Sequence, residues 1–526
     1  MKVAEHVLEA PHRESSRQVQ VSYLLFALCC GLYLVPFMPV LLLEPDQGTL
    51  LTGAVRVARG QVFARDFVEV MGPGTFYWLA LFMKLFGVTF LATRLCLFFT
   101  SFGTGLLIYF LSRRICTRFA SLACLLIGAA WPAWPAISHH IDSNFFALAG
   151  ISGCVFWLDK HKSRFLFTSG VLAGITTCFH QPKGMLLFAA LLIWIYLVHR
   201  RSLASRASSI ACVIVGYIGI LCFVLLYFWS HAALWDLINS SFIWPSKHYG
   251  MVNRVPYAQG LILYYWEMWR AMGGVLSIVL AGVLIVPLLL ISALPVVIPV
   301  LGIRQRVAFV KPEIVLYWLC GSALWLSEIH RRDIFHLVFG SPLLVILFIF
   351  YVQEMKTKTA EAVLQLASIC ACCLAVFNLF LTLSAHTVAT RVGKVAMFNS
   401  DHALAILEQK VRPGEEILVY PYCPTYYFLS EAVNPRRYSL LMYGYNTPSE
   451  FDEVVRVLDQ RHVKYVLWGR GFYSTAVATF FPLADQGGSG SHIVEPYLES
   501  HYSAVWANKD YLLLERKTDF DLVVTR

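Results

Sequence analysis

The stretch that decides the fold is EPDQGTLLTGAVRVARGQVFARDFVEVMGPGTFYW, residues 44–78. It follows an apolar run, 21–43, that is long enough to cross a bilayer. Apolar sequence resumes only after residue 78, so this stretch is a long first loop between two spans. Its charged residues are Glu44, Asp46, Arg56, Arg59, Arg65, Asp66 and Glu69. Any one of these carboxylates is more often simply solvated, but so many in one inter-span loop favour a chemical role.

The middle of this loop, 50–62, has the periodicity of a helix. Apolar residues share one helical face, with two arginines beside it: Leu51, Ala54, Val55, Ala58, Arg56 and Arg59. This pattern predicts an amphipathic helix that lies at the membrane surface. Gly72-Pro73-Gly74 then predicts a helix break before the aromatic residues that lead into the next span.

The composition indicates a multi-pass membrane protein with a water-exposed part. Hydrophobic residues make up 58% of the 526 residues and charged residues 14%, and the mean hydropathy is +0.63. The net charge of +10 does not indicate nucleic-acid binding, because the cations lie mostly in short loops between apolar runs. Most of the 14 cysteines lie inside apolar runs, as small core residues do. Cys370 and Cys373 have no second pair, so a zinc site is not predicted.

The chain divides into three parts. We expect residues 1–20 to form a cytoplasmic tail, 21–384 a membrane domain whose first span is retained because no small-residue cleavage site follows Leu43, and 385–526 an extracytoplasmic α/β domain. A requirement of about 20 residues per span predicts about eleven transmembrane helices. The proposed spans are 21–43, 79–111, 119–137, 143–158, 165–179, 184–198, 208–229, 272–301, 313–328, 334–352 and 362–384.

Cationic clusters set the orientation, because they fall in alternate loops and such loops face the cytoplasm. The clusters are Arg113/Arg114/Arg118, Lys160/Lys162/Arg164, Arg200/Arg201/Arg206, Arg304/Arg306/Lys311 and Lys356/Lys358. The loop 44–78, the segments 138–142, 180–183, 230–271 and 330–333, and everything after Ser384 are therefore predicted to lie outside.

The tail alternates predicted strands and a helix. Strands are expected at 416–420, 464–468 and 510–515, and a helix at 449–460 with Ser449 as its N-cap. Gly487 to Ser491 is expected to form a flexible loop. The alternation predicts a small α/β domain, and no phosphate-binding glycine loop follows any of these strands.

Several short motifs together resemble the GT-C glycosyltransferases. They are E-P-D-Q-G at 44–48, A-x-x-x-A-R-G-Q-V-F-A-R-D-F at 54–67, M-G-P-G-T-F-Y-W at 71–78, Pro-Lys-Gly at 182–184 and R-R-D-x-x-H at 331–336. The chain is most similar to bacterial members of the protein O-mannosyltransferase and lipid A aminoarabinose transferase types. The resemblance covers most of the membrane region and, more loosely, the tail. Many relatives have Asp-Glu where this chain has Asp46-Gln47.

The resemblance implies an inverting transfer of a sugar from a polyprenyl phosphate outside the cytoplasmic membrane. Such a reaction needs a base for the acceptor proton and cations for the phosphate leaving group. Asp46 is the expected base, and Asp142 a second catalytic carboxylate. Asp142 is equally well explained as a helix N-cap, because Asp142-Ser143-Asn144 opens an apolar run.

The expected phosphate ligands are cations in two later outer loops. Lys183 matches a lysine that the resembled family has in this loop, and the resemblance implies that it binds phosphate. The commoner role of a lysine at the end of a span is to extend its ammonium to the membrane interface. Arg331 and Arg332, with His336 one turn on, lie in a loop that is predicted to be outside, where the positive-inside rule disfavours arginine. Phosphate binding would explain their position, because a guanidinium donates two hydrogen bonds to a phosphate. Candidate acceptor or sugar contacts are Glu44, Asp66, His139 and His140. No metal or cofactor is expected, since two adjacent histidines suit a shared ion poorly and no further ligand has clear spacing.

The resulting hypothesis is a glycosyltransferase in a bacterial inner membrane, with its catalytic face outside the cytoplasm. Its partners would be a polyprenyl-phosphate sugar donor, a lipid, glycan or protein acceptor, and membrane lipids, but no nucleic acid. A flippase of lipid-linked sugars would share the spans and the outer cations. Flippases usually show internal repeats and mid-span polar residues. No repeat is evident here, and most ionisable residues lie at span ends. Lys84 and Arg94, inside the long segment 79–111, are the exceptions, and a start of this segment at the membrane interface would explain them equally well.

Overall fold

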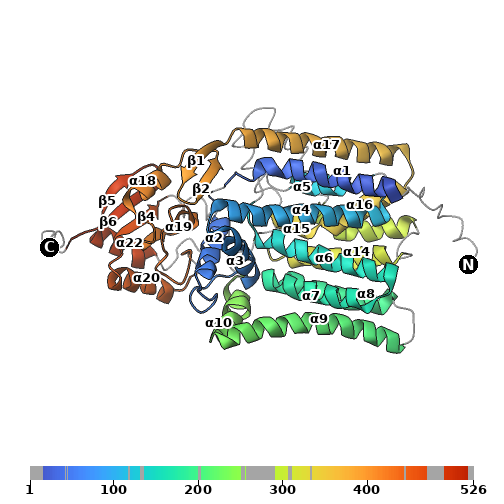
Figure 1. The fold of residues 1–526 in the computed structure, drawn as a ribbon, viewed down its shortest axis with the longest axis horizontal. Helices are drawn as coiled ribbons and strands as arrows, with labels where there is room; N and C mark the ends of the chain where they lie inside the picture. Colours follow the sequence, from blue (N-terminus) through green and yellow to red (C-terminus); the bar gives the residue numbers. More distant parts are fainter. Residues whose placement is uncertain are drawn as a thin grey trace, which may run out of the picture.

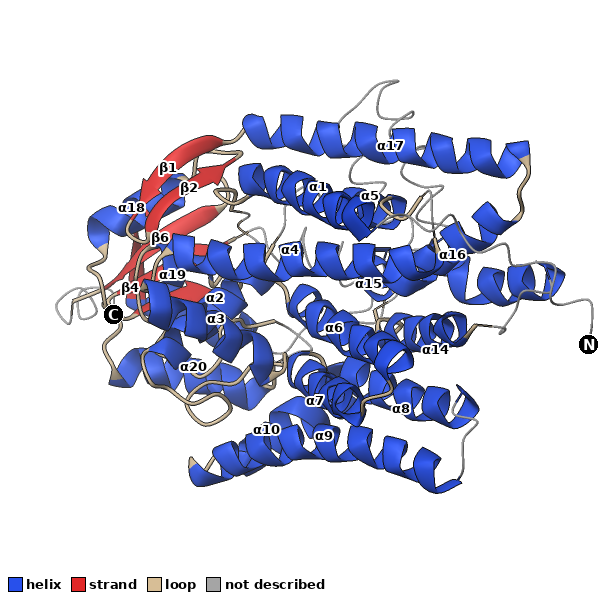
Figure 2. Cartoon of the chain, turned by 45° about the vertical axis from the view of Figure 1, so that its right-hand side comes forward, coloured by secondary structure: helices blue, strands red, loops and turns tan. Residues whose placement is uncertain are grey.

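The protein is described by a computed structural model that covers residues 16–41, 43, 45–116, 119–130, 136–198, 203–249, 255, 291–305, 311–331, 334–442, 446–470 and 491–518. Long helices run side by side, and a smaller part containing all the described strands covers one end of them (Figures 1 and 2). The first described helix, α1 (Ser16–Leu34), begins at the opposite end of the molecule (Figure 1). This arrangement agrees with a tail domain on the face opposite the N-terminus.

The helical part follows the predicted spans closely. Its long helices are α1 (Ser16–Leu34), α4 (Phe90–Ile115), α6 (His139–Lys160), α7 (Ser163–Phe179), α8 (Gln181–Val198), α9 (Leu203–Ser230), α14 (Pro312–Ser327), α16 (Pro342–Glu354) and α17 (Lys358–Leu383). Shorter elements are η1 (Val35–Phe37), α5 (Leu122–Ala130), α10 (Leu234–Ile238), η2 (Asn239–Ile243), η3 (Pro245–Tyr249) and α15 (Ile334–Gly340). Six described helices are long and apolar enough to cross a membrane, and Ile291–Gln305 is a shorter apolar one. Most of the predicted span 272–301 lies outside the described residues, so the number eleven stays a prediction.

Two predicted spans are each divided into two helices. The span 334–352 forms α15 and α16, on either side of Ser341. Residues 79–111 form two helices, α3 (Pro73–Phe86) and α4, rather than one. Gly87 separates them with φ 86°, a left-handed conformation that glycine adopts without strain. Thr89 then caps α4, because its side chain accepts a hydrogen bond from the backbone N–H of Ala92 at 3.2 Å. The hydropathy of the run hides this break, since the residues around it are apolar.

The first loop forms the helix α2 (Pro45–Ala58), which begins before the predicted residue 50. Leu50, Leu51 and Ala54 are completely buried in protein. The predicted position at the membrane surface is therefore wrong: α2 lies between the helices and the tail (Figure 1). Thr52 Oγ1 donates to the carbonyl of Pro424 at 2.9 Å, which fixes α2 against the tail.

The tail contains a hairpin, a four-stranded sheet and four described helices. The hairpin is β1 (His386–Thr390) with β2 (Gly393–Met397), and the sheet has the order β3-β4-β6-β5. Its strands are β3 (Ile417–Tyr420), β4 (Tyr465–Gly469), β5 (Tyr502–Ala507) and β6 (Tyr511–Arg516). β3 and β4 are parallel, whereas β6 is antiparallel to β4 and β5. The helices are α18 (His402–Lys410), α19 (Thr425–Leu429), α20 (Pro448–Gln460) and α22 (Ser491–His501).

The three predicted strands and the helix at 449–460 are confirmed. The predicted cap is wrong, because Thr447 is the N-cap of α20 and forms a capping box with Glu450. Ser449 instead shares a hydrogen bond with the Thr447 hydroxyl at 3.0 Å. The expected flexible loop at 487–491 lies outside the described residues except for Ser491, where α22 begins. The hairpin β1–β2 and the strand β5 had no clear pattern in the sequence.

The tail is attached to the chain that leaves the first helix and to the first loop. Leu41 N–H donates to the Ala396 carbonyl at 2.9 Å, and Ala396 N–H donates to the Pro39 carbonyl at 2.6 Å. Val68 N–H donates to the carbonyl of Arg437 at 2.9 Å. The loop 44–78 is thus built jointly with residues more than 300 positions later.

Candidate active site

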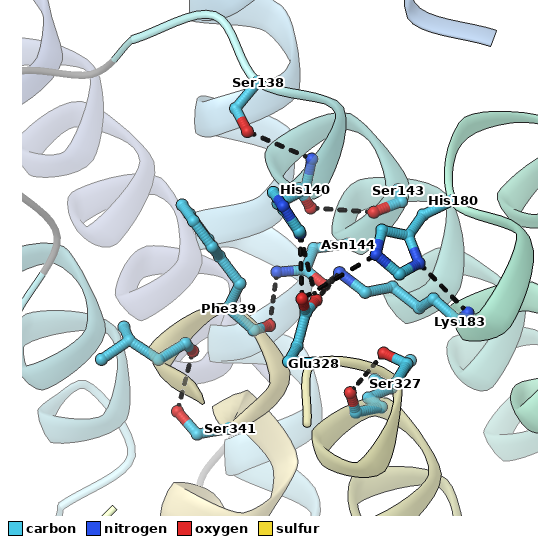
Figure 3. A network of polar contacts seen from close by, with 12 residues as sticks. Ser138, His140, Ser143, Asn144, His180, Lys183, Ser327, Glu328, Phe339 and Ser341 are labelled. Carbon is cyan, nitrogen blue, oxygen red and sulfur yellow. Dashed lines mark hydrogen bonds and ion pairs between the residues drawn. The ribbon is translucent and has the colours of Figure 1, made fainter. Parts of the chain in front are cut away.

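A buried polar cluster lies where the ends of α6, α8, α14 and α15 meet (Figure 3). At its centre Lys183 Nζ lies 2.8 Å from Glu328 Oε1 and donates to Asn144 Oδ1 at 2.9 Å. Both Lys183 and Glu328 have side chains that are 0% exposed. A fully buried ammonium does not snorkel, so the commoner explanation for Lys183 fails.

Local sequence fixes each element of the cluster. Ser138 caps α6 by accepting from His140 N–H at 3.2 Å, which places His139 and His140 in the first turn. The helix α7 ends at Phe179 and α8 begins at Gln181, so Lys183 falls in the first turn of α8. A Cβ on Gly184 would lie 2.2 Å from Thr177. Only glycine therefore allows the two helices to approach so closely beside Lys183.

Histidines surround the Lys183–Glu328 pair. The ring centroid of His140 lies 4.0 Å from that of His139, 5.1 Å from that of His180 and 4.9 Å from that of His336. The ring of His180 lies 5.8 Å from that of His330. A site of this composition offers several hydrogen-bond donors and acceptors around the Lys183–Glu328 pair.

The hydrogen bonds assign the tautomers of two histidines. His140 Nδ1 lies 3.2 Å from Glu328 Oε1 and 3.1 Å from Oε2, and because a carboxylate only accepts, Nδ1 carries the hydrogen. Only the contact with Oε1 has the geometry of a hydrogen bond, so Glu328 Oε2 is left without one among the described residues. His180 Nδ1 accepts from the backbone N–H of Lys183 at 3.2 Å, so its hydrogen is on Nε2. His180 Nε2 lies 3.9 Å from Glu328 Oε2.

The cluster brings together predicted phosphate ligands, Lys183 and His336, and predicted acceptor or sugar contacts, His139 and His140. Arg331 is 7% exposed at its edge. Arg331 N–H donates to the carbonyl of Glu328 at 3.2 Å. Arg332 and Glu44 lie outside the described residues. The Lys183 ammonium is paired with Glu328, and one oxygen of that carboxylate has no hydrogen bond among the described residues. This cluster is therefore a candidate site for an anion.

Asp142 is buried near the cluster but faces another way. Its carboxyl lies beside the hydroxyls of Thr75 and Thr100, on α3 and α4. Its side chain is 4% exposed. It does not cap α6, because Ser138 does. The structure thus contradicts the N-cap explanation and leaves Asp142 buried between three helices.

Asp46 lies in the first turn of α2 and is exposed. Its neighbour Gln47 is completely buried. Gln47 Oε1 accepts from Ile137 N–H at 3.1 Å and from Arg94 Nη2 at 3.2 Å. Ile137 stands two residues before His139, so these bonds hold the start of α2 beside the chain that enters the cluster.

Asp66 is engaged within the first loop. Its Oδ1 accepts from Arg65 Nε at 2.9 Å, and its Oδ2 accepts from Val62 N–H at 2.7 Å. The Arg65 guanidinium and this backbone bond lower the pKa of the carboxyl. These contacts give Asp66 a role in shaping the loop; the proposed sugar contact stays a prediction.

The donor atoms of two triads lie within 4.8 Å of one another: His139, His140 and His180, and His180, Glu328 and His330. His180 is therefore a possible third metal ligand beside His139 and His140, which the sequence did not indicate. Two observations weigh against a metal ion here. Glu328 is already paired with the Lys183 ammonium, and the bond from Lys183 N–H places the hydrogen of His180 on Nε2. The expectation of no metal stays a prediction.

Sequence reasoning missed Glu328, Asn144 and His180 as site residues. The available signal was a single acidic residue at the C-terminal end of the apolar run 313–328, next to three basic side chains. Asn144 and His180 carried no such signal, because isolated polar residues at span ends are common.

Comparison with known proteins gives two findings. Residues 71–229 match the sequence profile of the dolichyl-phosphate-mannose-protein mannosyltransferase family. The structure is similar to that of ArnT from Cupriavidus metallidurans bound to undecaprenyl phosphate, with a TM-score of 0.52, 14% identity and coverage of 96% of this chain and 99% of ArnT. For ArnT in the apo state the TM-score is 0.55 at 13% identity, covering 95% and 98% of the two chains. A search of curated proteins gave no significant match.

These findings confirm the resemblance to the GT-C glycosyltransferases. The solved structures cover nearly the whole chain, so the membrane part and the tail together have the ArnT-like fold. The family profile begins at Met71 and ends at Trp229, and therefore includes Asp142 and Lys183 but not Asp46.

Proposed function

We propose that this protein is a membrane glycosyltransferase that takes a sugar from a polyprenyl phosphate and transfers it to an acceptor. The observation that carries the proposal is the buried ammonium of Lys183 in a histidine-rich cluster. In the GT-C fold, a buried cation at this end of the helices suits a lipid-linked phosphate. The family profile over 71–229 favours an enzyme over a flippase.

The cluster acts on the step in which the phosphate leaves the sugar. When the sugar leaves, the bond between its anomeric carbon and the phosphate oxygen breaks, and that oxygen keeps the electron pair. The phosphate then carries one more negative charge, which Lys183, Arg331 and the histidine N–H groups stabilise. Charge stabilisation in a buried site is stronger than in water.

Asp46 acts as the base in this proposal. It takes the proton of the acceptor hydroxyl while that oxygen attacks the anomeric carbon from the face opposite the phosphate, which inverts the configuration. Its exposure at the first turn of α2 leaves it accessible to an acceptor. The bonds of Gln47 to Ile137 and Arg94 hold this turn in place.

The proposed setting is a bacterial inner membrane with the catalytic end outside the cytoplasm. The helix ends that lie away from α2 carry the cationic loops, which supports a cytoplasmic position for those ends. Arg114 lies there and pairs with Asp159 at 2.6 Å and with Glu313 at 3.3 Å. The tail lies at the other end, with α2 (Figure 1). The acceptor would then be a lipid, glycan or protein of the cell envelope.

The experiment measures transfer of labelled sugar from polyprenyl phosphate in membranes, together with binding of the lipid donor. Asp46→Asn is nearly isosteric but accepts no proton, so transfer should fall roughly a hundred- to ten-thousand-fold while donor binding persists. Asp401→Asn is the matched control, because asparagine also caps helices well and Asp401 caps α18 in the tail. Transfer by Asp46→Asn within about threefold of wild type, far below a base contribution, would reject Asp46 as the base.

A further inference from the structure

We propose that Glu328 occupies the place of the donor phosphate at Lys183 until the donor binds, and then releases Lys183 to it. This inference rests on the proposed function and adds a residue that the sequence did not indicate. Glu328 would therefore be a positioning residue that holds Lys183 charged and oriented, and that also competes with the substrate for it.

The burial of Lys183 is the first argument. An ammonium that is completely out of water is strongly disfavoured unless an anion pairs with it. Glu328 Oε1, at 2.8 Å, is the carboxylate oxygen that the described residues provide for it. A buried lysine without any counter-ion would lose its proton, and the donor phosphate supplies that counter-ion once it replaces Glu328.

The second argument is that Glu328 is incompletely satisfied in this position. Its Oε1 accepts from both Lys183 and His140, whereas its buried Oε2 has no hydrogen-bond partner among the described residues. His140 Nδ1 lies 3.1 Å from Oε2 as well, but its single N–H is directed at Oε1. A buried carboxylate oxygen without a hydrogen bond has a cost in free energy. The pair is thus stable enough to order Lys183 but is not the best arrangement for Glu328.

The third argument is that a second set of partners is already in reach. His180 Nε2, which carries a hydrogen, lies 3.9 Å from Oε2. A small rotation of the carboxylate away from Lys183 shortens this distance while the His140 bond is kept. Asn144 meanwhile holds Lys183 Nζ at 2.9 Å, so the ammonium stays in place while its anion is exchanged.

The test is the affinity for undecaprenyl phosphate in detergent micelles, measured for wild type and for Glu328→Gln. Glutamine keeps the shape of the side chain but no longer competes as an anion or repels the phosphate. Loss of a like charge at a few ångströms predicts that Glu328→Gln binds at least about tenfold more tightly than wild type. A merely structural role predicts weaker binding, because the site would be damaged.

Glu69→Gln is the matched control. Glu69 is a second buried glutamate, 6% exposed, and it accepts from Ser439 N–H at 3.1 Å where the first loop meets the tail. Its replacement removes a buried carboxylate elsewhere and should leave the affinity for the lipid phosphate unchanged. Should Glu328→Gln fail to fold, Glu328→Asp retracts the carboxylate from Lys183 and should bind more tightly than wild type by a smaller factor.

The outcomes separate the two proposals. Absence of binding to wild type would overturn the proposed function and this inference with it. Binding to wild type with equal or weaker binding to both Glu328 variants would overturn the inference alone. Loss of wild-type binding after treatment with a chelator would also overturn it, because Glu328 and the histidines would then be metal ligands.

Discussion

Gln47 Oε1 accepts a hydrogen bond from the backbone N–H of Ile137 at 3.1 Å, and so joins α2 to the approach to α6. The same oxygen accepts from the guanidinium of Arg94, which is 1% exposed, at 3.2 Å. Many GT-C enzymes that the chain resembles have glutamate at this position. Here a neutral amide has a structural role, because it positions the turn that bears Asp46 and accepts a hydrogen bond from the buried guanidinium of Arg94 in α4.

Replacement of Gln47 should therefore misplace the turn that bears Asp46. Gln47→Leu removes both hydrogen bonds, and loss of a bond to a charged group costs about 1.5 to 3 kcal/mol. We expect a lower thermal unfolding midpoint in detergent and reduced transfer. Gln47→Glu keeps the acceptor oxygen and adds a charge opposite Arg94, so it should retain stability. Equal midpoints for the leucine variant and wild type would contradict this role.

The Lys183–Glu328 pair predicts a separation of stability from function. Lys183→Met leaves a buried carboxylate without its counter-ion, which destabilises by about 3 to 5 kcal/mol. The double variant Lys183→Met/Glu328→Gln removes both charges and should recover most of that stability. It should not recover binding of undecaprenyl phosphate, measured in parallel with thermal unfolding. Recovered binding would show that Lys183 is not the phosphate ligand.

Glu69 predicts a pH dependence of stability. Burial raises the pKa of its carboxyl to about 7, although hydrogen bonds from Ser439 and the charge of Arg56 oppose the shift. The ordinary value is 4.5, so between pH 4.5 and 7 the folded state binds more protons than the unfolded state. The free energy of unfolding therefore falls as pH rises through this window, by up to about 1.4 kcal/mol per pH unit.

Comparison of wild type with Glu69→Gln isolates this contribution from other titrating groups. The difference in unfolding midpoint between the two proteins should change between pH 5 and pH 7 in favour of the glutamine variant. It should stay constant above about pH 8, where the Glu69 carboxyl is ionised in both states. A difference that is constant from pH 5 to pH 7 would mean that Glu69 titrates normally.

Gly48 predicts a strong steric effect at the contact between the first loop and the tail. A Cβ at this position would lie 2.3 Å from Thr425 Oγ1 and 2.4 Å from the Thr425 backbone nitrogen. Gly48→Ala must therefore push α19 of the tail away from α2, because a backbone atom cannot yield as a flexible side chain does. We expect loss of transfer and faster proteolysis of the tail. Gly60→Ala is the control for a neighbouring glycine, since no atom lies within 4 Å of its added Cβ, although its φ of 91° adds strain.

Cysteine labelling tests the orientation. A membrane-impermeant maleimide on intact cells should label Arg65→Cys in the first loop and Glu499→Cys in the tail. It should not label Lys160→Cys or Lys356→Cys, which lie in cationic loops predicted to be cytoplasmic. The unsubstituted protein corrects for its own cysteines. Labelling of Arg65→Cys and Lys160→Cys from the same side would refute the topology and the proposed catalytic face.

Sequence reasoning recovered the features that depend on local pattern. Helices from α6 to α9 were predictable from apolar runs, and Lys183 from its motif and its place at a span end. Glu328 was not predictable, because its partner Lys183 lies 145 positions earlier and only tertiary packing joins them. The position of α2 was mistaken for a similar reason: an apolar helical face reads the same whether lipid or another domain covers it.

The joint between the first loop and the tail has a consequence for biosynthesis. A ribosome completes residues 44–78 long before it reaches Thr425, Arg437 or Ser439, which supply the loop with hydrogen bonds and packing. Until then the part of α2 around Gly48 and Thr52, which contacts Thr425 and Pro424 in the complete chain, is uncovered. Polypeptides that end before Pro424 are therefore expected to have an incompletely packed first loop even when every described membrane helix has been inserted.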